Sequence, residues 1–271
     1  MSDIVLSSGV RSNLLQLQQT SELITSTQTK LATGKRVNSA LDNPINFFTA
    51  QGLTGRAKDL NALLDTMSTG INTIQAANNG ISAITKLVQS AQSLVSQANQ
   101  TTDTTVRATL AAQFDALRTQ IDQLSGDSGI NGVNLLNNNS LTITLNENGS
   151  SNVVISGYDD TTGGALALNA SANSWASSAD IAAAGTELAA SLVTLRSQSQ
   201  ALSSNLQTVQ IRQDFTKAMI NTLNTGADGL TLADSNEEGA NLLALQTRQQ
   251  LSTTALSLAS QADQNVLKLF Q

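Results

Sequence analysis

The chain has 271 residues, with 14 Lys and Arg against 20 Asp and Glu, a net charge of -6, and neither His nor Cys. It therefore lacks the commonest proton shuttle, the thiol nucleophile and the usual ligands of zinc, haem and iron–sulfur clusters. This argues against an enzyme and predicts no cofactor and no metal site. The acidic balance argues against a nucleic-acid partner, because binding phosphates needs a concentrated basic face. Hydrophobic residues make up 40% of the chain but aromatics only 3%, which suits long packed helices better than a catalytic domain.

No stretch approaches the ~18 consecutive apolar residues of a membrane span, so we expect no membrane insertion. The first residues, 1–6, lack the basic and apolar regions of a cleavable secretory signal. Two interpretations stay open at this point. The protein is cytoplasmic, or it is secreted through an uncleaved N-terminus that hydropathy does not detect.

The first forty residues carry a thin apolar stripe at helical spacing. Its members lie seven residues apart, with one further leucine beside them: Val10, Leu17, Ile24, Leu31 and Leu14. The intervening heptad positions are polar: Asn13, Thr20 and Thr27. Such a helix cannot bury enough area alone to offset the entropy of ordering it. It needs a partner, either the other end of the chain or another molecule.

A helix of about fifty residues is predicted over 46–100, with Asp42 or Asn43 as candidate cap and Pro44 near the first turn. Its apolar residues recur at strict seven-residue intervals: Leu53, Leu60, Met67, Ile74, Ile81, Val88 and Val95. An unstrained helix would drift by ~20° per heptad, so a repeat this long indicates left-handed supercoiling against partner helices.

The middle of the chain changes character twice. A second helix opens at Asp103 as N-cap and has one apolar face at 3–4 residue spacing. Glycine and asparagine then mark turns, and two alternating stretches predict a β-hairpin at about 141–157. Residues 158–178, rich in Gly, Ser, Ala and Asn, are expected to form a short exposed tip.

Helical spacing resumes in a third long helix, about 180–224, the expected antiparallel partner of 46–100. The run Asn224–Gly229 is expected to interrupt it. Asp234 then resembles an N-cap with the acidic residue Glu237 at position N3, and this pattern predicts the start of a last helix. The apolar positions assigned to that helix are Leu251, Ala255, Leu258, Ala262 and Leu269. The acidic pairs Asp159–Asp160 and Glu237–Glu238 are interpreted as a turn and a helix start.

Several motifs then resemble one family in the right order along nearly the whole chain. Residues 33–42 resemble a segment near the N-terminus of bacterial flagellins, through Gly34, Arg36, Asn38, Ser39, Ala40 and Asp42. Residues 131–133, before the hairpin, resemble the family's Phe-Asn-Gly, and residues 246–270 resemble its closing helix. The pattern is most similar to short flagellins of alphaproteobacterial type.

The resemblance implies a mainly α fold: a long antiparallel coiled-coil-like helical bundle with one β-hairpin and paired terminal helices. It implies an inner terminal coiled-coil domain, 1–42 plus 231–271, and a helical rod domain, 43–230, without large outer domains. The residues expected at the self-assembly interface in the inner coiled coil are Val10, Leu14, Leu17, Ile24, Leu31, Leu251, Leu258, Val266, Leu269 and Phe270.

The implied function is that of a structural subunit that polymerises into the flagellar filament, for motility. Implied partners are further copies of the chain, hook–filament junction and cap proteins, and an export chaperone at the C-terminal segment. The implied location is the extracellular filament, after type III export.

Three alternatives remain. A hook–filament junction protein has the same fold and similar ends, although the closing residues 266–270 favour flagellin. Some flagellins carry a zinc site in an insert with two histidines, which a chain without His cannot form. A helical effector or adhesin explains the heptads but not the ordered motifs.

Overall fold

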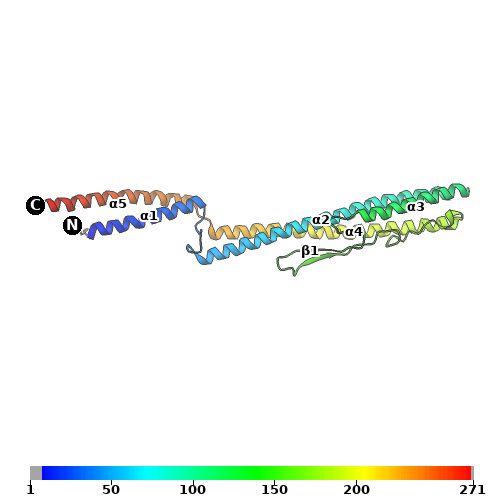
Figure 1. Cartoon of the computed structure of the whole chain (residues 1–271), viewed down its shortest axis with the longest axis horizontal. Coiled ribbons are helices and arrows are strands. Elements are labelled where there is room, and N and C mark those ends of the chain that lie inside the picture. The colour runs from blue at the N-terminus through cyan, green and yellow to red at the C-terminus, as the bar shows by residue number, and fades with distance from the viewer. Residues whose placement is uncertain (1–7, 270–271) are drawn as a thin grey trace. The chain divides into compact units, whose positions relative to one another are not determined.

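The computed structural model describes residues 8–269, except the side chains of 263 and 266–269. Within this range lie five α-helices, one 3-10 turn and one two-stranded antiparallel sheet, as Figure 1 shows. In chain order the elements are α1 (Ser8–Thr33), α2 (Pro44–Asn99), α3 (Thr104–Asp127), β1 (Leu141–Thr144), β2 (Asn152–Ile155), η1 (Ala172–Trp175), α4 (Ser178–Thr231) and α5 (Ser235–Leu269). The predicted mainly α class with one hairpin is confirmed. The chain divides into two compact units, residues 1–55 with 222–271, and residues 56–221.

Short polar side chains cap the N-termini of three of the helices. Asn43 accepts a hydrogen bond from the backbone of Asn46 (3.0 Å), so Asn43 rather than Asp42 caps α2. Asp103 accepts bonds from the backbone N–H groups of two residues in the first turn of α3. At α5, Asp234 does the same for Asn236 (2.8 Å) and the residue after it. The predicted caps at 103 and 234 are confirmed.

The predicted interruption at 224–229 is wrong, because α4 continues to Thr231. A helix-interior glycine costs about 1 kcal/mol relative to alanine, but here Leu223 and Ala227 are buried on one face. A Cβ at Gly226 would lie 3.4 Å from the Leu53 side chain of α2, which is ordinary van der Waals contact. Packing therefore outweighs the local preference of the glycines.

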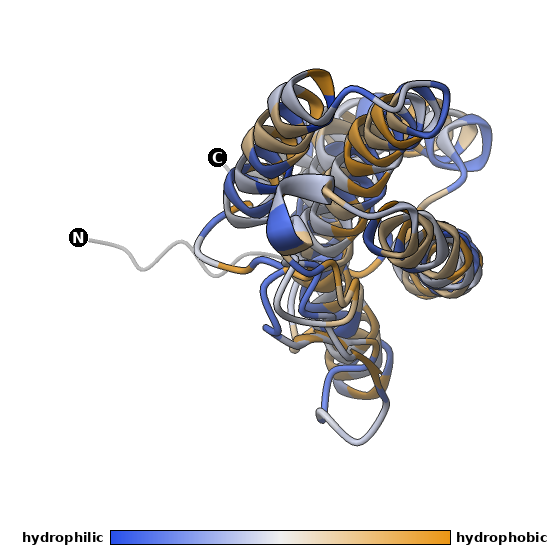
Figure 2. Ribbon diagram, turned by 90° about the vertical axis from the view of Figure 1, so that its right-hand side faces the viewer, coloured by the Kyte–Doolittle hydropathy of each residue, from blue (hydrophilic) through white to orange (hydrophobic). Residues whose placement is uncertain are grey.

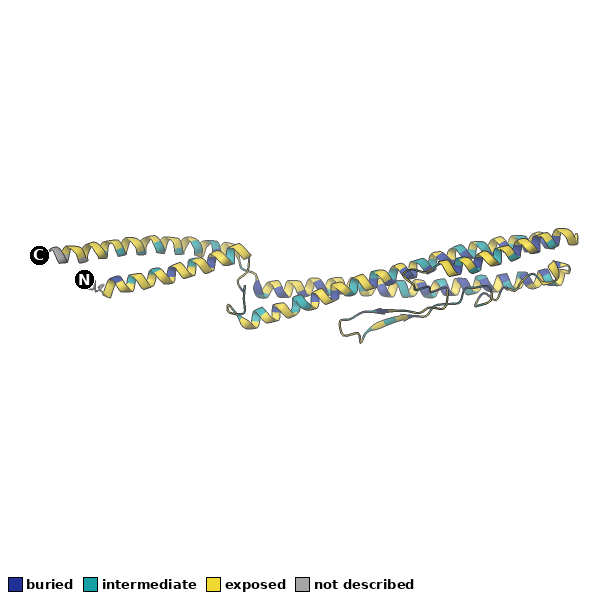
Figure 3. Ribbon diagram, viewed as in Figure 1, coloured by how far each residue is buried: buried dark blue, intermediate teal, exposed yellow. Residues whose placement is uncertain are grey.

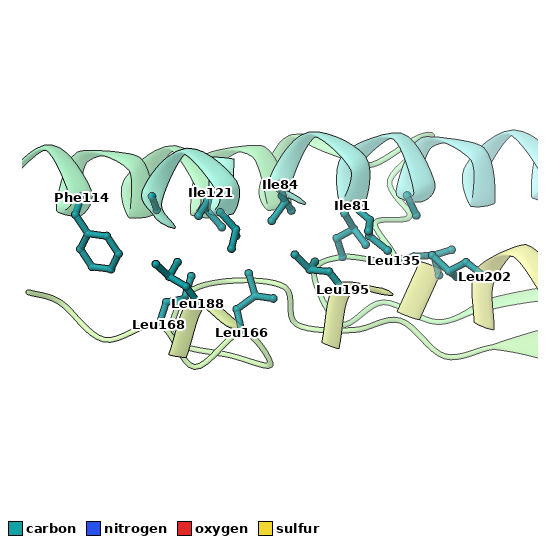
Figure 4. Packing of buried hydrophobic residues seen from close by; sticks show 14 of the residues in the cluster. Ile81, Ile84, Phe114, Ile121, Leu135, Leu166, Leu168, Leu188, Leu195 and Leu202 are labelled. Atoms are coloured by element: carbon teal, nitrogen blue, oxygen red, sulfur yellow. The ribbon is translucent and has the colours of Figure 1, made fainter. Parts of the chain in front are cut away.

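The core of residues 56–221 follows the heptads predicted on the two long helices. Hydrogen bonds join Ser199 to Asn78 and Gln213 to Ser68. The later residue of α4 therefore pairs with the earlier residue of α2, so the two helices are antiparallel. Figure 4 shows side chains from α2, α3, α4 and the connecting loops meeting in one cluster. Figure 2 shows hydrophobic and hydrophilic residues side by side along the long helices, as expected for helices buried on one face.

The hairpin lies within the predicted 141–157, with Leu141 opposite Ile155 in the antiparallel register. Ile143 and Ile155 are buried. Gly70 on α2 leaves the space that Ile143 fills, since a Cβ at this glycine would overlap the isoleucine side chain. The Arg56 guanidinium also forms an ion pair with Glu147 in the hairpin turn. The hairpin thus packs along α2.

The segment 158–178 is not the exposed tip that its composition suggested. Leu166, Leu168 and Trp175 are fully buried, and the Trp175 ring lies 5.1 Å from the Phe114 ring of α3, centre to centre. Arg118 of α3 donates a hydrogen bond to the Leu168 carbonyl (2.9 Å). A few large side chains anchor a segment that is otherwise small and polar.

Candidate subunit interface

The unit formed by residues 1–55 and 222–271 holds α1 and α5 side by side. The Arg36 backbone N–H donates to the Thr231 carbonyl (2.7 Å), and Ala233 donates to the Gly34 carbonyl (3.0 Å). Lys30 near the end of α1 forms an ion pair with Glu238 in the first turn of α5 (3.1 Å). The end of α1 therefore lies beside the start of α5, and the helices are antiparallel.

The family-like motif forms the turn between α1 and α2. Gly34 ends α1 with a φ of +67°, a backbone conformation that favours glycine. The Asp42 carboxylate accepts hydrogen bonds from the backbone of Asn38 (2.9 Å) and from the backbone (2.8 Å) and hydroxyl (3.2 Å) of Ser39. The Ser39 and Asn38 backbone donors lower the pKa of Asp42, while Ala40 lies half-buried inside the turn. These residues fix the connection.

The α1–α5 contact is a continuous heptad seam. On α1 the buried or half-buried positions at heptad spacing are Val10, Asn13, Leu17, Thr20, Ile24, Thr27 and Leu31, and Lys30 beside them is also half-buried. On α5 the corresponding positions are Glu238, Leu242, Leu245, Gln249, Ser252, Leu256 and Ala259, with Gly239 beside them. Both sets follow alternating spacings of three and four residues, as in a coiled coil. Because about half of these positions are polar or small, the seam buries little apolar area.

Several leucines of this unit point away from the seam. Figure 3 shows α1 and α5 mostly exposed. On α5, Leu243, Leu251 and Leu258 are about two-thirds exposed, at 67%, 65% and 63%. On α1, Leu15 and Leu23 are more than half exposed and Leu14 is 40% exposed.

The predicted interface residues therefore fall into three groups. Val10, Leu17, Ile24 and Leu31 lie in the seam, whereas Leu14, Leu251 and Leu258 lie outside it. Phe270 lies outside the described residues, and so do the side chains of Val266 and Leu269. Their shared role in assembly stays a prediction.

Sequence reasoning missed the α5 half of the seam. It followed the more regular leucines at 251 and 258, whereas the helix packs through Leu242, Leu245 and Leu256. The missed signal was the 3–4 spacing of a mixed stripe, in which Glu238 and Gln249 occupy positions that a search for apolar residues skips.

The described residues contain no group of three or more acidic, His or Cys side chains that could hold a metal ion. No helix within this part of the chain is long and apolar enough to span a membrane. The described residues do form long helices, and several leucines of α1 and α5 are exposed to solvent. This defines a class of protein that acts through extended surfaces, as an assembly subunit does.

The comparisons with known proteins name the family. Residues 8–140 match the bacterial flagellin N-terminal helical region. The chain is 31% identical over 280 residues to flagellin FljK of Caulobacter vibrioides, covering 100% of this chain and 99% of that protein. It is 27% identical to a flagellin of Brucella melitensis, covering 100% of both. A crystal structure of Bacillus cereus flagellin is similar to 55% of this chain and 86% of that one, with 15% identity and a TM-score of 0.47.

The chain belongs to the flagellin family, on the evidence of the full-length relatives. Flagellins polymerise into the extracellular flagellar filament. This protein is accordingly a structural filament subunit for motility rather than an enzyme, and the alternative of a hook–filament junction protein is not favoured.

Proposed function

We propose that residues 1–42 and 231–271 form the inner coiled-coil domain of the filament and residues 43–230 its helical rod domain. The observation that carries this proposal is the exposed leucine face of α5, because a coiled coil with a thin seam and a second apolar face suits helices packed on several sides. Leu251 and Leu258 contact neighbouring copies in this arrangement, while Val10, Leu17, Ile24 and Leu31 hold α1 against α5.

The rod domain carries no large outer domain. Between the end of α3 and the start of α4 lie the hairpin and the segment 158–178. Since both contribute buried side chains to the rod core, we propose that this rod forms the outer surface of the filament.

Secretion and the further partners follow from the family resemblance. The subunit passes through the type III export channel, and it binds hook–filament junction and cap proteins at the filament ends. An export chaperone binds its C-terminal segment before transit. The absence of Cys supports the export route, because no disulfide can form during passage.

A double substitution, Leu251→Ser with Leu258→Ser, should weaken polymerisation strongly and leave the monomer folded. Both side chains are about two-thirds exposed in the single chain, so their loss removes little internal packing. Burying a leucine stabilises by about 1.5–3 kcal/mol. Losing two at every subunit contact should raise the critical concentration for polymerisation by about 100-fold or more. Sedimentation of polymer over a series of protein concentrations measures this.

The matched control is Thr254→Ser with Gln261→Ser, at exposed α5 positions that present no large apolar group. Circular dichroism of both variants should match that of the original monomer. Filaments that form from the leucine variant at an unchanged critical concentration would contradict the proposed interface.

A further inference from the structure

A groove runs between α2 and α4 within residues 56–221. It has a volume of about 460 Å³. Buried Ile81 and Leu195, with half-buried Leu192, form an apolar floor. Lys86 from α2 and Arg196 from α4 are exposed at its rim.

These two cations stand apart from the other charges of the long helices. Lys86 is the only charged residue of α2 between positions 66 and 99, and Arg196 is the only one of α4 between 188 and 211. No carboxylate lines the groove. Within the part of the chain that the structure describes, neither side chain takes part in an ion pair or hydrogen bond.

Most other cations of this unit have partners. Arg56, Arg118 and Lys217 form ion pairs with carboxylates of the same unit. Arg107 is buried and donates to backbone carbonyls, including that of Thr101 (2.8 Å). The groove is thus a local excess of positive charge in a unit that carries eight Lys and Arg against twelve Asp and Glu.

The geometry of a helical polymer indicates what fills such a groove. Contacts that propagate a filament are heterologous, meaning that one surface of a subunit meets a different surface of the next. A cationic groove on one face is complementary in charge to an acidic surface on another face of the same chain. Asp59, Asp65 and Asp127 are exposed carboxylates of this unit with no hydrogen bond or ion pair among the described residues.

We propose that Lys86 and Arg196 bind carboxylate side chains of a second copy of this chain in the filament. The inference rests on the proposed function and adds a specific contact to it. The planar Arg196 guanidinium offers paired donors to a carboxylate, and Lys86 adds a second positive charge. Ser82 and Gln89 at the rim supply further polar groups, and the apolar floor accommodates the aliphatic stem of the incoming residue.

Zero-length cross-linking with a carbodiimide tests the contact directly, since it joins an ammonium group only to a carboxylate that touches it. Filaments are assembled from equal parts of unlabelled and ¹⁵N-labelled protein, cross-linked, digested and examined by mass spectrometry. The expected product is a mixed-label peptide that joins Lys86 to an Asp or Glu, absent from cross-linked monomer. Filaments that yield cross-links at other lysines but none at Lys86 would overturn the proposal.

Charge reversal supplies a second test. Lys86→Glu with Arg196→Glu should raise the critical concentration for polymerisation about tenfold, because two contacts with carboxylates are lost and the reversal adds repulsion. The effect of salt at this contact should also reverse, because added salt screens an attraction in the original protein and a repulsion in the variant. The matched control, Lys58→Glu with Arg212→Glu, reverses one exposed Lys of α2 and one exposed Arg of α4 outside the groove.

Different results would contradict the proposed function and the groove contact. If the unmodified protein forms no filaments, the proposed function fails. If it polymerises, and the groove variant polymerises as well as its control, the groove contact alone fails.

Discussion

Replacing Trp175 by alanine should lower the free energy of unfolding of residues 56–221 by about 3–5 kcal/mol, the range for deleting a fully buried large aromatic side chain. The indole is completely buried against Phe114. Its removal would leave a cavity where the segment 158–178 meets α3. Urea unfolding followed by circular dichroism at 222 nm measures the loss.

Trp175→Phe is the matched control and should cost much less. The ring contact with Phe114 survives this change, and the Trp175 Nε1 group is a buried donor without an acceptor in the described part of the chain, so phenylalanine removes an unsatisfied polar atom. Equal losses in the two variants would show that the tryptophan does not anchor the segment through its packing.

Asp160→Asn should stabilise the same unit at neutral pH by about 2–3 kcal/mol. Asp160 is fully buried, and neither of its carboxylate oxygens has a hydrogen-bond partner among the residues that the structure describes. Burial raises the pKa of Asp160 to about 6, against a smaller lowering by the nearby Gln198 amide, and the charge of Asp159 adds to the rise. A rise of about two units corresponds to about 3 kcal/mol, present when the buried group is ionised.

The sign of this effect fixes the pH window. The folded protein holds the proton up to about pH 6, whereas the unfolded chain releases it near the ordinary value of 3.8. Stability should therefore fall as the pH rises from about 4 to 6, with the full penalty above that range. Asp160→Asn should remove this slope and equal the original protein below about pH 4. Asp65→Asn, at an exposed and unpaired carboxylate, is the control, and an identical pH profile for all three proteins would contradict the assignment.

The long-range pattern of the rod could be predicted because it repeats. Leu188, Leu195 and Leu202 on α4 face the strictly spaced apolar series of α2, and each of these side chains is buried. The caps at Asp103 and Asp234 were also predictable, since a carboxylate directly before a helix readily accepts hydrogen bonds from the free N–H groups of its first turn.

Two predictions made from local sequence were wrong because tertiary packing determines the structure at those positions. The residues 224–229 look like a break, yet Leu223 and Ala227 on their buried face keep α4 helical. In the same way, Asp160 was interpreted as part of a surface turn, but the fold buries its side chain completely. Neither outcome follows from composition, because each depends on a neighbour far away in the sequence.

For the interface, the α1 seam could be predicted and the α5 seam could not. On α1 the apolar residues spaced seven apart, such as Val10, Leu17 and Ile24, predicted the face that packs in the seam. By contrast, α5 carries two stripes, one mixed and one with Leu251 and Leu258. The sequence alone does not say which stripe faces α1 and which remains for other copies.

Electron cryo-microscopy of filaments grown from the purified, unmodified protein tests the central claim most directly. The account predicts helical filaments in which α1 and α5 pack as the inner layer, with the exposed leucine face of α5 against neighbouring copies, and residues 56–221 as the outer layer. Protein that stays monomeric or forms only closed oligomers under polymerising conditions, or filaments with α1 and α5 on the outside, would contradict it.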